Sequence, residues 1–235
     1  MTTQSVPQTV SGAKSDYIVA KFGGTSVANF EAMSRCSEII VADKSVRIVA
    51  VSASAGVTNH LVALCKPDLS KEQRQAHIDG VLAIQQAILD ELSLDADLAV
   101  GFNETLKAFQ TLALETLTTD QQHDELLSFG ERLSSYLFAQ VLRLKGLNAD
   151  RFDVRQVLKT DSQFGKATPN VSATAQAAKE YLIPLLDDQV IVTQGFVGSD
   201  EFGQTTTLGR GGSDYSAALL AEAINAKSVH IWTDV

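Results

Sequence analysis

Cysteine, proline and long apolar stretches are scarce in this sequence, and this scarcity excludes several classes of protein. The 235 residues include four prolines and two cysteines, Cys36 and Cys65, whose spacing fits no metal or redox motif. Residues 1–15 are polar and lack the apolar core of a signal peptide. These features predict structural thiols in a cytoplasmic protein. No apolar stretch is long enough to span a bilayer, so no membrane partner is expected.

Positive charge is also in deficit. The chain has 19 Lys and Arg against 28 Asp and Glu, which gives a formal net charge of −9. Binding to nucleic acids needs clustered Lys and Arg to contact phosphates, so no nucleic-acid partner is expected. A protein of this charge that handles an anion must use a few local donors.

Several familiar catalytic motifs are missing. The sequence contains no P-loop, no dinucleotide-binding G-x-G-x-x-G after its first predicted strand, no H-E-x-x-H and no G-x-S-x-G. These absences argue against P-loop enzymes, dinucleotide-dependent enzymes, zinc proteases and α/β-hydrolases.

The apolar pattern predicts an α/β fold. Short Val- and Ile-rich runs predict strands at 17–22, 46–52, 149–154, 189–198, near the TTTL segment and at 228–233. Helical spacing is found near 30–40, 78–92, 98–116, 126–144, 172–186 and 213–226. Such alternation predicts a three-layer sandwich, with a mainly parallel sheet covered by helices on both faces.

The predicted elements form one domain, residues 16–235, after a flexible tail at 1–15. Consecutive helices between about 70 and 146 interrupt the alternation of strands and helices. The last strand ends at the carboxyl terminus in WTDV, with nothing to cover it. We therefore expect the chain to be cut inside its natural domain.

Three glycine-bearing polar stretches follow predicted strands, where open α/β sheets bind ligands. The first, KFGGTS at 21–26, places Lys21 and two glycines before a helix, an arrangement that suits a phosphate. A plain glycine turn with a solvated lysine explains it equally well. The second, SASAGVTN at 52–59, offers the hydroxyls of Ser52 and Thr58. A loop that caps the next helix is the simpler interpretation of this stretch.

The third stretch, TTTLGRGGSD, carries the most specific signal. A hairpin turn followed by a helix that Ser213 caps accounts for the serine and one glycine. It does not account for Arg210 between Gly209 and Gly211, a guanidinium suited to a carboxylate or phosphate. Asp214 could favour the helix dipole or meet a cation.

One acidic residue in a predicted helix is a further candidate. Glu131 follows Gly130 in SFGERLSS, which suggests an inward-facing acid, although most such residues lie at the surface. Lysine, arginine, glycine backbone, hydroxyls and a few carboxylates together suit phosphoryl transfer, which depends on positioning and charge neutralisation.

These motifs, in this order and approximate spacing, resemble those of the aspartate kinases, a family with the amino-acid kinase fold. KFGGTSV, SASAGVTN, SFGERLS, TTTLGRGGSDYSAALLAEA and IWTDV carry the resemblance, which runs from about residue 17 to the end. Among the aspartate kinases, the sequence resembles the lysine-sensitive bacterial type, aspartokinase III. The family pattern continues beyond WTDV into further nucleotide-binding and regulatory parts, which are absent here.

The resemblance implies transfer of the ATP γ-phosphoryl group to L-aspartate, giving 4-phospho-L-aspartate, with Mg²⁺ bridging the phosphates. This is the first step of lysine, threonine and methionine biosynthesis. The resemblance further implies a homodimer for the full-length protein.

The resemblance also implies roles for individual residues. It assigns ATP binding to Lys21, Phe22, Gly23, Gly24, Thr233 and Asp234, and catalysis to Lys21 and Asp214. It assigns aspartate binding to Ser52, Thr58, Glu131, Arg210, Gly211, Gly212 and Ser213, with Glu131 on the ammonium group and Arg210 on the α-carboxylate. It assigns no side chain to the metal.

Other functions stay open. A truncated, non-catalytic module of the same fold could capture an amino acid or an anion without chemistry. Glutamate or a nucleoside monophosphate could be the acceptor, although KFGGTSV together with Glu131 and Arg210 argues against both.

Overall fold

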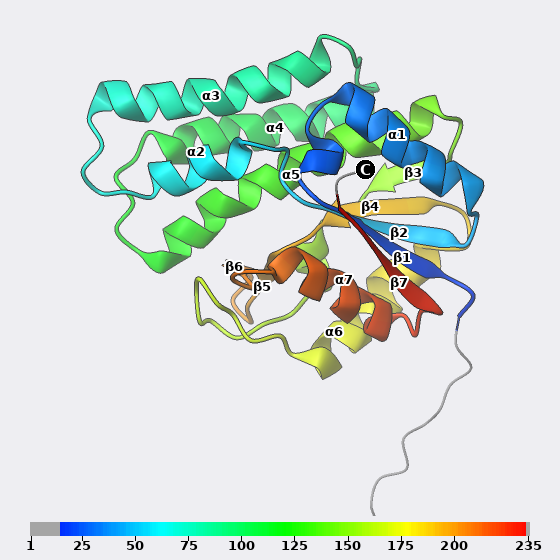
Figure 1. Cartoon of the computed structure of the whole chain (residues 1–235). Helices are drawn as coiled ribbons and strands as arrows, with labels where there is room; N and C mark the ends of the chain where they lie inside the picture. Colours follow the sequence, from blue (N-terminus) through cyan, green and yellow to red (C-terminus); the bar gives the residue numbers. More distant parts are fainter. Residues whose placement is uncertain (1–14, 234–235) are drawn as a thin grey trace, which may run out of the picture.

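The computed structural model describes residues 15–233, and a parallel sheet forms its centre (Figure 1). The sheet contains β1 (Ile18–Phe22), β2 (Val46–Val51), β3 (Ala149–Arg151), β4 (Val190–Gln194) and β7 (Ser228–Trp232). The strand order is β3-β4-β2-β1-β7, and every neighbouring pair is parallel. The predicted tail at 1–15 lies outside the described residues except for Ser15.

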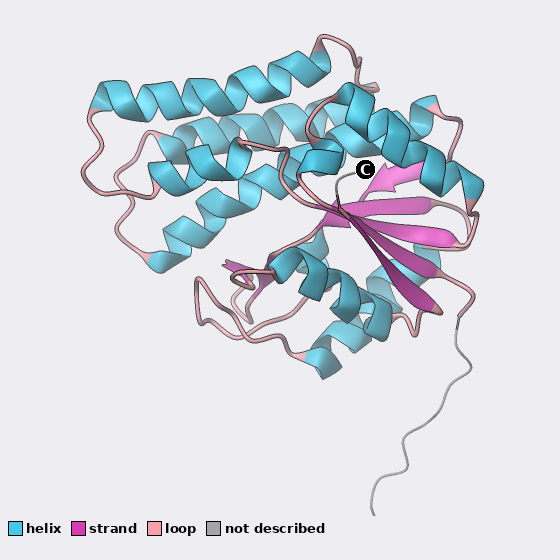
Figure 2. Ribbon diagram, viewed as in Figure 1, coloured by secondary structure: helices cyan, strands magenta, loops and turns pink. Residues whose placement is uncertain are grey.

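Helices cover both faces of this sheet (Figures 1 and 2). On one face lie α1 (Phe30–Ala42) and α5 (Asp120–Leu144), and on the other lie α6 (Val171–Ala177) and α7 (Gly212–Ala223). Successive strand residues point to opposite faces, so β1 contributes to two cores. Phe22 packs in the core beside α1 and α5, whereas Val19 packs in the core beside α7. The predicted three-layer sandwich is confirmed.

The register of the sheet brings four strand ends together. Phe22 pairs with Val51 on one side and Trp232 on the other, and Val51 also pairs with Gln194. Because the strands are parallel, the segments that follow them leave the sheet at one edge.

A helical layer extends beyond that edge. It consists of α2 (Val57–Leu64), α3 (Lys71–Leu89), α4 (Ala96–Ala113) and the first half of α5 (Figure 1). Capping boxes at Ser70 and Thr119 fix where α3 and α5 begin. Every residue of α5 from Ser128 to Leu142 is buried, because the sheet and the other helices surround it.

The predicted strand at 189–198 is in fact two strands. After β4, the chain bends at Gly195 and Phe196 before β5 (Val197–Ser199), which pairs antiparallel with β6 (Thr205–Thr207). Phe196 has a φ of 69°, a left-handed conformation that is rare for a bulky residue. A continuous apolar run in the sequence gives no sign of such a bend.

Two other predicted elements are shorter than expected. The predicted helix at 172–186 is regular only in α6 and continues as a π-helical turn, Ala178–Leu182, and a 3₁₀ turn, Ile183–Leu185. Pro184 lacks an N–H group and ends the regular ladder. The strand expected at 149–154 stops at Arg151, because Asp153 caps a 3₁₀ turn, Val154–Gln156.

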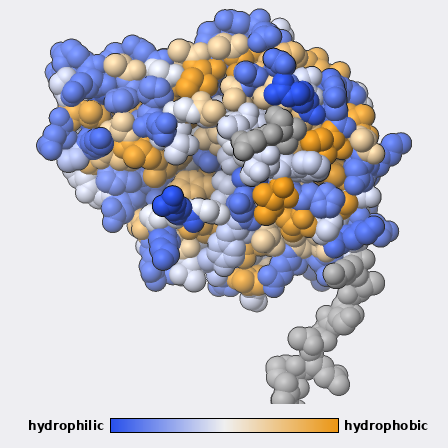
Figure 3. Space-filling model, in the orientation of Figure 1, coloured by the Kyte–Doolittle hydropathy of each residue, from blue (hydrophilic) through white to orange (hydrophobic). Residues whose placement is uncertain are grey.

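Among residues 15–233, no helix is both long and apolar enough to cross a membrane. Hydrophilic and apolar residues are interspersed over the face seen in Figure 3.

Gly130 lets α5 approach the segment after β2. A Cβ atom at this position would lie 2.6 Å from the Cβ of Ala53. We predict that Gly130→Ala lowers the free energy of unfolding by about 1–3 kcal/mol through overpacking. Glycine to alanine inside a helix ordinarily raises stability by about 1 kcal/mol, so the sign is diagnostic in chemical denaturation. A stabilised variant would contradict this close packing.

Candidate active site

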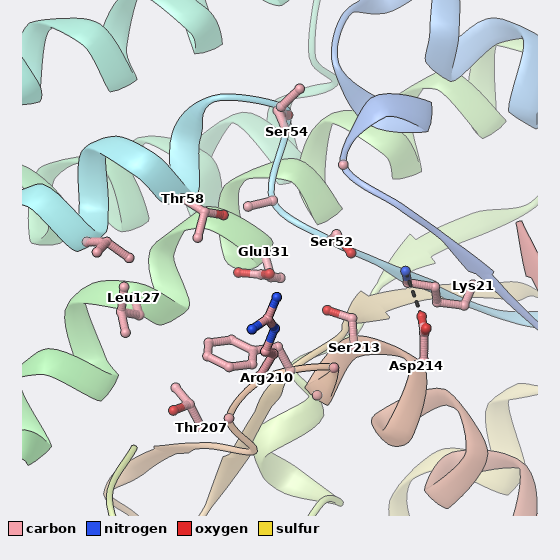
Figure 4. A pocket seen from close by; sticks show the side chains of 18 of the residues that line it. Lys21, Ser52, Ser54, Thr58, Leu127, Glu131, Thr207, Arg210, Ser213 and Asp214 are labelled. Atoms are coloured by element: carbon pink, nitrogen blue, oxygen red, sulfur yellow. Dashed lines mark ion pairs between the residues drawn. The ribbon is translucent and has the colours of Figure 1, made fainter. Parts of the chain in front are cut away.

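A cavity of about 550 Å³ lies at the sheet edge where the segments after β1 and β2 meet α5 and the start of α7 (Figure 4). Most of the site residues expected from the sequence line it. They are Lys21, Gly24, Ser52, Thr58, Glu131, Arg210, Gly211, Gly212, Ser213 and Asp214. The structure thus brings together residues from four separate parts of the chain.

The remaining expected residues do not line this cavity. The ring of Phe22 is fully buried, tilted against Phe138 at 5.6 Å and stacked on Trp232 at 6.5 Å. The N–H of Gly23 donates to the carbonyl of Trp232 at 3.2 Å. Thr233 is exposed beyond the end of β7, and Asp234 lies outside the described residues. Phe22 and Gly23 therefore shape the turn from inside the sheet.

Lys21 and Asp214 form an ion pair at the wall of the cavity. The Nζ atom of Lys21 lies 2.7 Å from Oδ1 of Asp214, and the two side chains are 8% and 49% exposed. Asp214 lies in the first turn of α7, where the positive end of the helix dipole favours an acid. The ion pair thus holds a nearly buried ammonium group against the cavity (Figure 4).

Glu131 lies deep in the cavity, only 6% exposed. Burial raises the pKa of its carboxyl group to about 7, while a backbone hydrogen bond with Ala53 and the charge of Lys21 act in the opposite direction. A cation beside Glu131 would therefore stabilise the ionised form of this buried carboxyl group.

Arg210 lies across the cavity from Glu131. Gly209 and Gly211 have φ angles of 74° and 77°, which only glycine adopts readily, and the N–H of Gly212 donates to the carbonyl of Gly209. Figure 4 shows the guanidinium pointing into the cavity toward Glu131. The two glycines thus bend the chain so that Arg210 projects into the cavity. An acid and a guanidinium that face each other suit a zwitterionic amino acid.

The interpretation of Ser213 as a helix cap is wrong. The N-cap residue of α7 is Gly211, in a left-handed conformation and without a side-chain cap, and Ser213 follows inside the helix. Its side chain lines the cavity instead.

A buried aspartate that the sequence did not single out braces one wall. The carboxylate of Asp124 on α5 accepts hydrogen bonds from the N–H and hydroxyl of Thr207, at 2.8 and 2.7 Å, and from the N–H of Gly165. Burial raises the pKa of Asp124, and these hydrogen bonds lower it. Thr207, Gly165 and Phe196 also line the cavity. Asp124 lies in a polar stretch, QQHDELL, where no local signal marks it as buried.

The sequence profile of the amino acid kinase family matches residues 16–235. The chain belongs to this family. The lysine-sensitive aspartokinase 3 of Escherichia coli (strain K12) is 46% identical to it over 223 residues, which are 94% of this chain and 49% of that protein. An aspartokinase of Chlamydia trachomatis is 38% identical over 218 residues, 93% of this chain and 48% of that protein.

A solved structure also shows the similarity of this amino acid kinase to an aspartokinase. The crystal structure of E. coli aspartokinase III in complex with aspartate and ADP matches it with a TM-score of 0.88 and 46% identity. The match covers 93% of this chain and 49% of that one. The predicted resemblance to the lysine-sensitive bacterial aspartate kinases is confirmed. The chain spans about half the length of the curated relatives it matches.

The buried carboxyl of Glu131 predicts a pH-dependent stability. Its pKa rises from 4.5 to about 7 on folding, so the folded state favours the protonated form. Stability from this group is full below the lower value and is lost as the pH rises through the higher one. We predict that Glu131→Gln becomes the more stable protein as the pH rises, by about 3 kcal/mol at most.

Chemical denaturation at about pH 5 and about pH 8 measures this difference. The matched control is Glu91→Gln, which removes an exposed carboxyl group. An equal stability difference between wild type and Glu131→Gln at both pH values would show that Glu131 is not destabilised by burial.

Proposed function

We propose that this amino acid kinase is the catalytic part of an aspartate kinase. It transfers the ATP γ-phosphoryl group to the side-chain carboxylate of L-aspartate, giving 4-phospho-L-aspartate and ADP. The observation that carries the proposal is the placement of Glu131 and Arg210 on opposite walls of one cavity, with Lys21 at its end (Figure 4). The aspartokinases to which the chain is similar support it.

L-Aspartate presents three charges that these side chains complement. Glu131 binds the ammonium group, and Arg210 binds the α-carboxylate through its paired N–H groups. Ser52, Thr58 and Ser213 supply hydroxyl contacts, and Gly211 and Gly212 supply backbone at the start of α7. The side-chain carboxylate then extends toward Lys21.

The chemistry needs charge neutralisation more than proton transfer. An oxygen of the substrate carboxylate, already ionised at neutral pH, forms the new bond to phosphorus, and the bond from phosphorus to the ADP oxygen breaks. No general base is required. Lys21 offsets the negative charge that accumulates as one anion approaches another, and Asp214 holds its Nζ atom in place.

The residues of the cavity fit a nucleotide that brings its own metal. Among the described residues, no three His, Cys, Asp or Glu side chains gather as a metal site. Mg²⁺ commonly keeps several waters and binds substrate phosphates with few protein ligands. When bound, it would offset the negative charge of the ATP phosphates, which Lys21 and Gly24 would face from the turn after β1.

Calorimetric titration of the chain with L-aspartate, with L-glutamate as comparator, tests substrate recognition. We expect selective binding of L-aspartate: Glu131 and Arg210 hold the ammonium group and α-carboxylate that both amino acids share, and the extra methylene of glutamate would misplace its side-chain carboxylate relative to Lys21. Equal binding of both amino acids would contradict the proposal. An ADP-release assay separates the alternatives, since aspartate binding without ADP formation would favour a non-catalytic, amino-acid-binding fragment.

Two substitutions separate binding from chemistry. We predict that Arg210→Ala weakens aspartate binding about ten- to a hundredfold, since it removes a charge-assisted contact. Lys21→Ala lowers turnover about 10²- to 10³-fold and affects aspartate affinity less. Titration and steady-state ADP release, measured on both variants in a chain that turns over, check this division. Unchanged turnover in Lys21→Ala would rule out its charge-neutralising role.

A further inference from the structure

A second cavity, of about 240 Å³, lies along a different face of α5. It is lined by residues of α4, α5 and β3 and of the 3₁₀ turn Val154–Gln156, and it shares none of them with the active site. Glu131 and Arg132 are neighbours on α5 and line different cavities. The lining residues are Gly101, Glu104, Thr105, Arg132, Tyr136, Arg151, Asp153 and Arg155.

Three guanidinium groups are largely buried around this cavity. The side chains of Arg132, Arg151 and Arg155 are 11%, 13% and 26% exposed. Arg132 lies over the ring of Phe129 at 4.4 Å, and Arg151 lies over the ring of Tyr136 at 4.6 Å. Stacking of this kind holds a guanidinium plane in one orientation.

The ion pairs of the cluster do not fully balance its positive charge, and the exposed Glu104 at the rim belongs to none of these pairs. Among the described residues, the three arginines pair with two carboxylates, those of Glu125 and Asp153, at 2.6 to 3.8 Å. The Nε atoms of Arg132 and Arg151 are buried and have no hydrogen-bond partner. A buried cationic N–H group that lacks an acceptor is costly, and the charge of an anion in the cavity would stabilise these arginines.

The proximity of the arginines adds to this imbalance. Burial lowers the pKa of Arg132, the charge of Arg155 acts in the same direction, and Glu125 opposes both. Arg155 is itself fixed, because it donates to Asp153 and to the hydroxyl of Thr205. The like charges are therefore held together by the fold.

We propose that this cavity, the arginine pocket, binds a phosphate group, either as inorganic phosphate or as a small phosphomonoester. Guanidinium groups match phosphate oxygens in pairs, and Thr105 and Tyr136 add hydroxyls to the lining. Pockets for larger ligands commonly measure about 300–1,000 Å³, so the size favours a small anion. This inference does not rest on the proposed function.

Titration of the chain with inorganic phosphate at low ionic strength tests the arginine pocket. Arg151→Gln is expected to weaken binding about tenfold or more, because a charged donor is lost. Glu104 is an exposed acid at the rim that repels an anion, so Glu104→Gln is expected to strengthen binding about two- to fivefold. Glycerol 3-phosphate in a parallel titration distinguishes the two sources: tighter binding than phosphate identifies a phosphomonoester, and equal binding identifies the free ion.

Lys21→Ala serves as the control, because it removes a cation from the active site and leaves the arginine pocket intact. Phosphate binding that is lost in Lys21→Ala and kept in Arg151→Gln would place the ion in the active site and overturn the proposal. Absence of binding to the folded chain at millimolar phosphate would show that the arginines form a structural ion-pair network only. If Arg151→Gln fails to fold, the Glu104→Gln variant is sufficient by itself: an unchanged affinity for phosphate in that variant overturns the proposal.

Discussion

Burial of the Glu131 carboxyl group within α5 is the constraint on which the active site depends. A pKa raised to about 7 corresponds to about 3 kcal/mol of unfavourable solvation at higher pH. The residues packed around this part of α5 leave the Glu131 side chain little contact with water. An ammonium group placed beside Glu131 would offset part of this cost, so the burial that raises the pKa also favours a cation in the cavity.

Parallel strand register explains why distant residues meet around Glu131. The ends of β1, β2 and β4 are paired in the sheet. Lys21, the segment from Ser52 to Thr58 and the bend at Phe196 therefore lie side by side and line one cavity. The antiparallel pair β5–β6 then brings the chain back toward the sheet, so that α7 starts at the same edge. Asp124 links α5 to this return through Thr207.

The sequence predicts the sheet, its covering helices and most of the expected site residues that line the cavity, because strand periodicity and glycine-rich turns are local signals. The bend at Phe196 was missed, since an apolar run does not show that one of its residues has a left-handed backbone conformation. Asp124 was missed because its burial depends on contacts with Thr207 and Gly165, far along the chain. The capping role expected for Ser213 failed because Gly211 already occupies the cap. The arginine pocket has no sequence motif at all, since its members come from separate elements.

The burial of α5 between Ser128 and Leu142 has a consequence for attempts to reshape the cavity. Any change of size on this helix displaces neighbours on several sides at once, as the close approach of Gly130 to Ala53 illustrates. The segments 52–58 and 209–213 contribute residues that are partly exposed and have room to adjust. Substitutions in these two segments should therefore change the shape of the cavity with less disturbance of the packing than substitutions on α5.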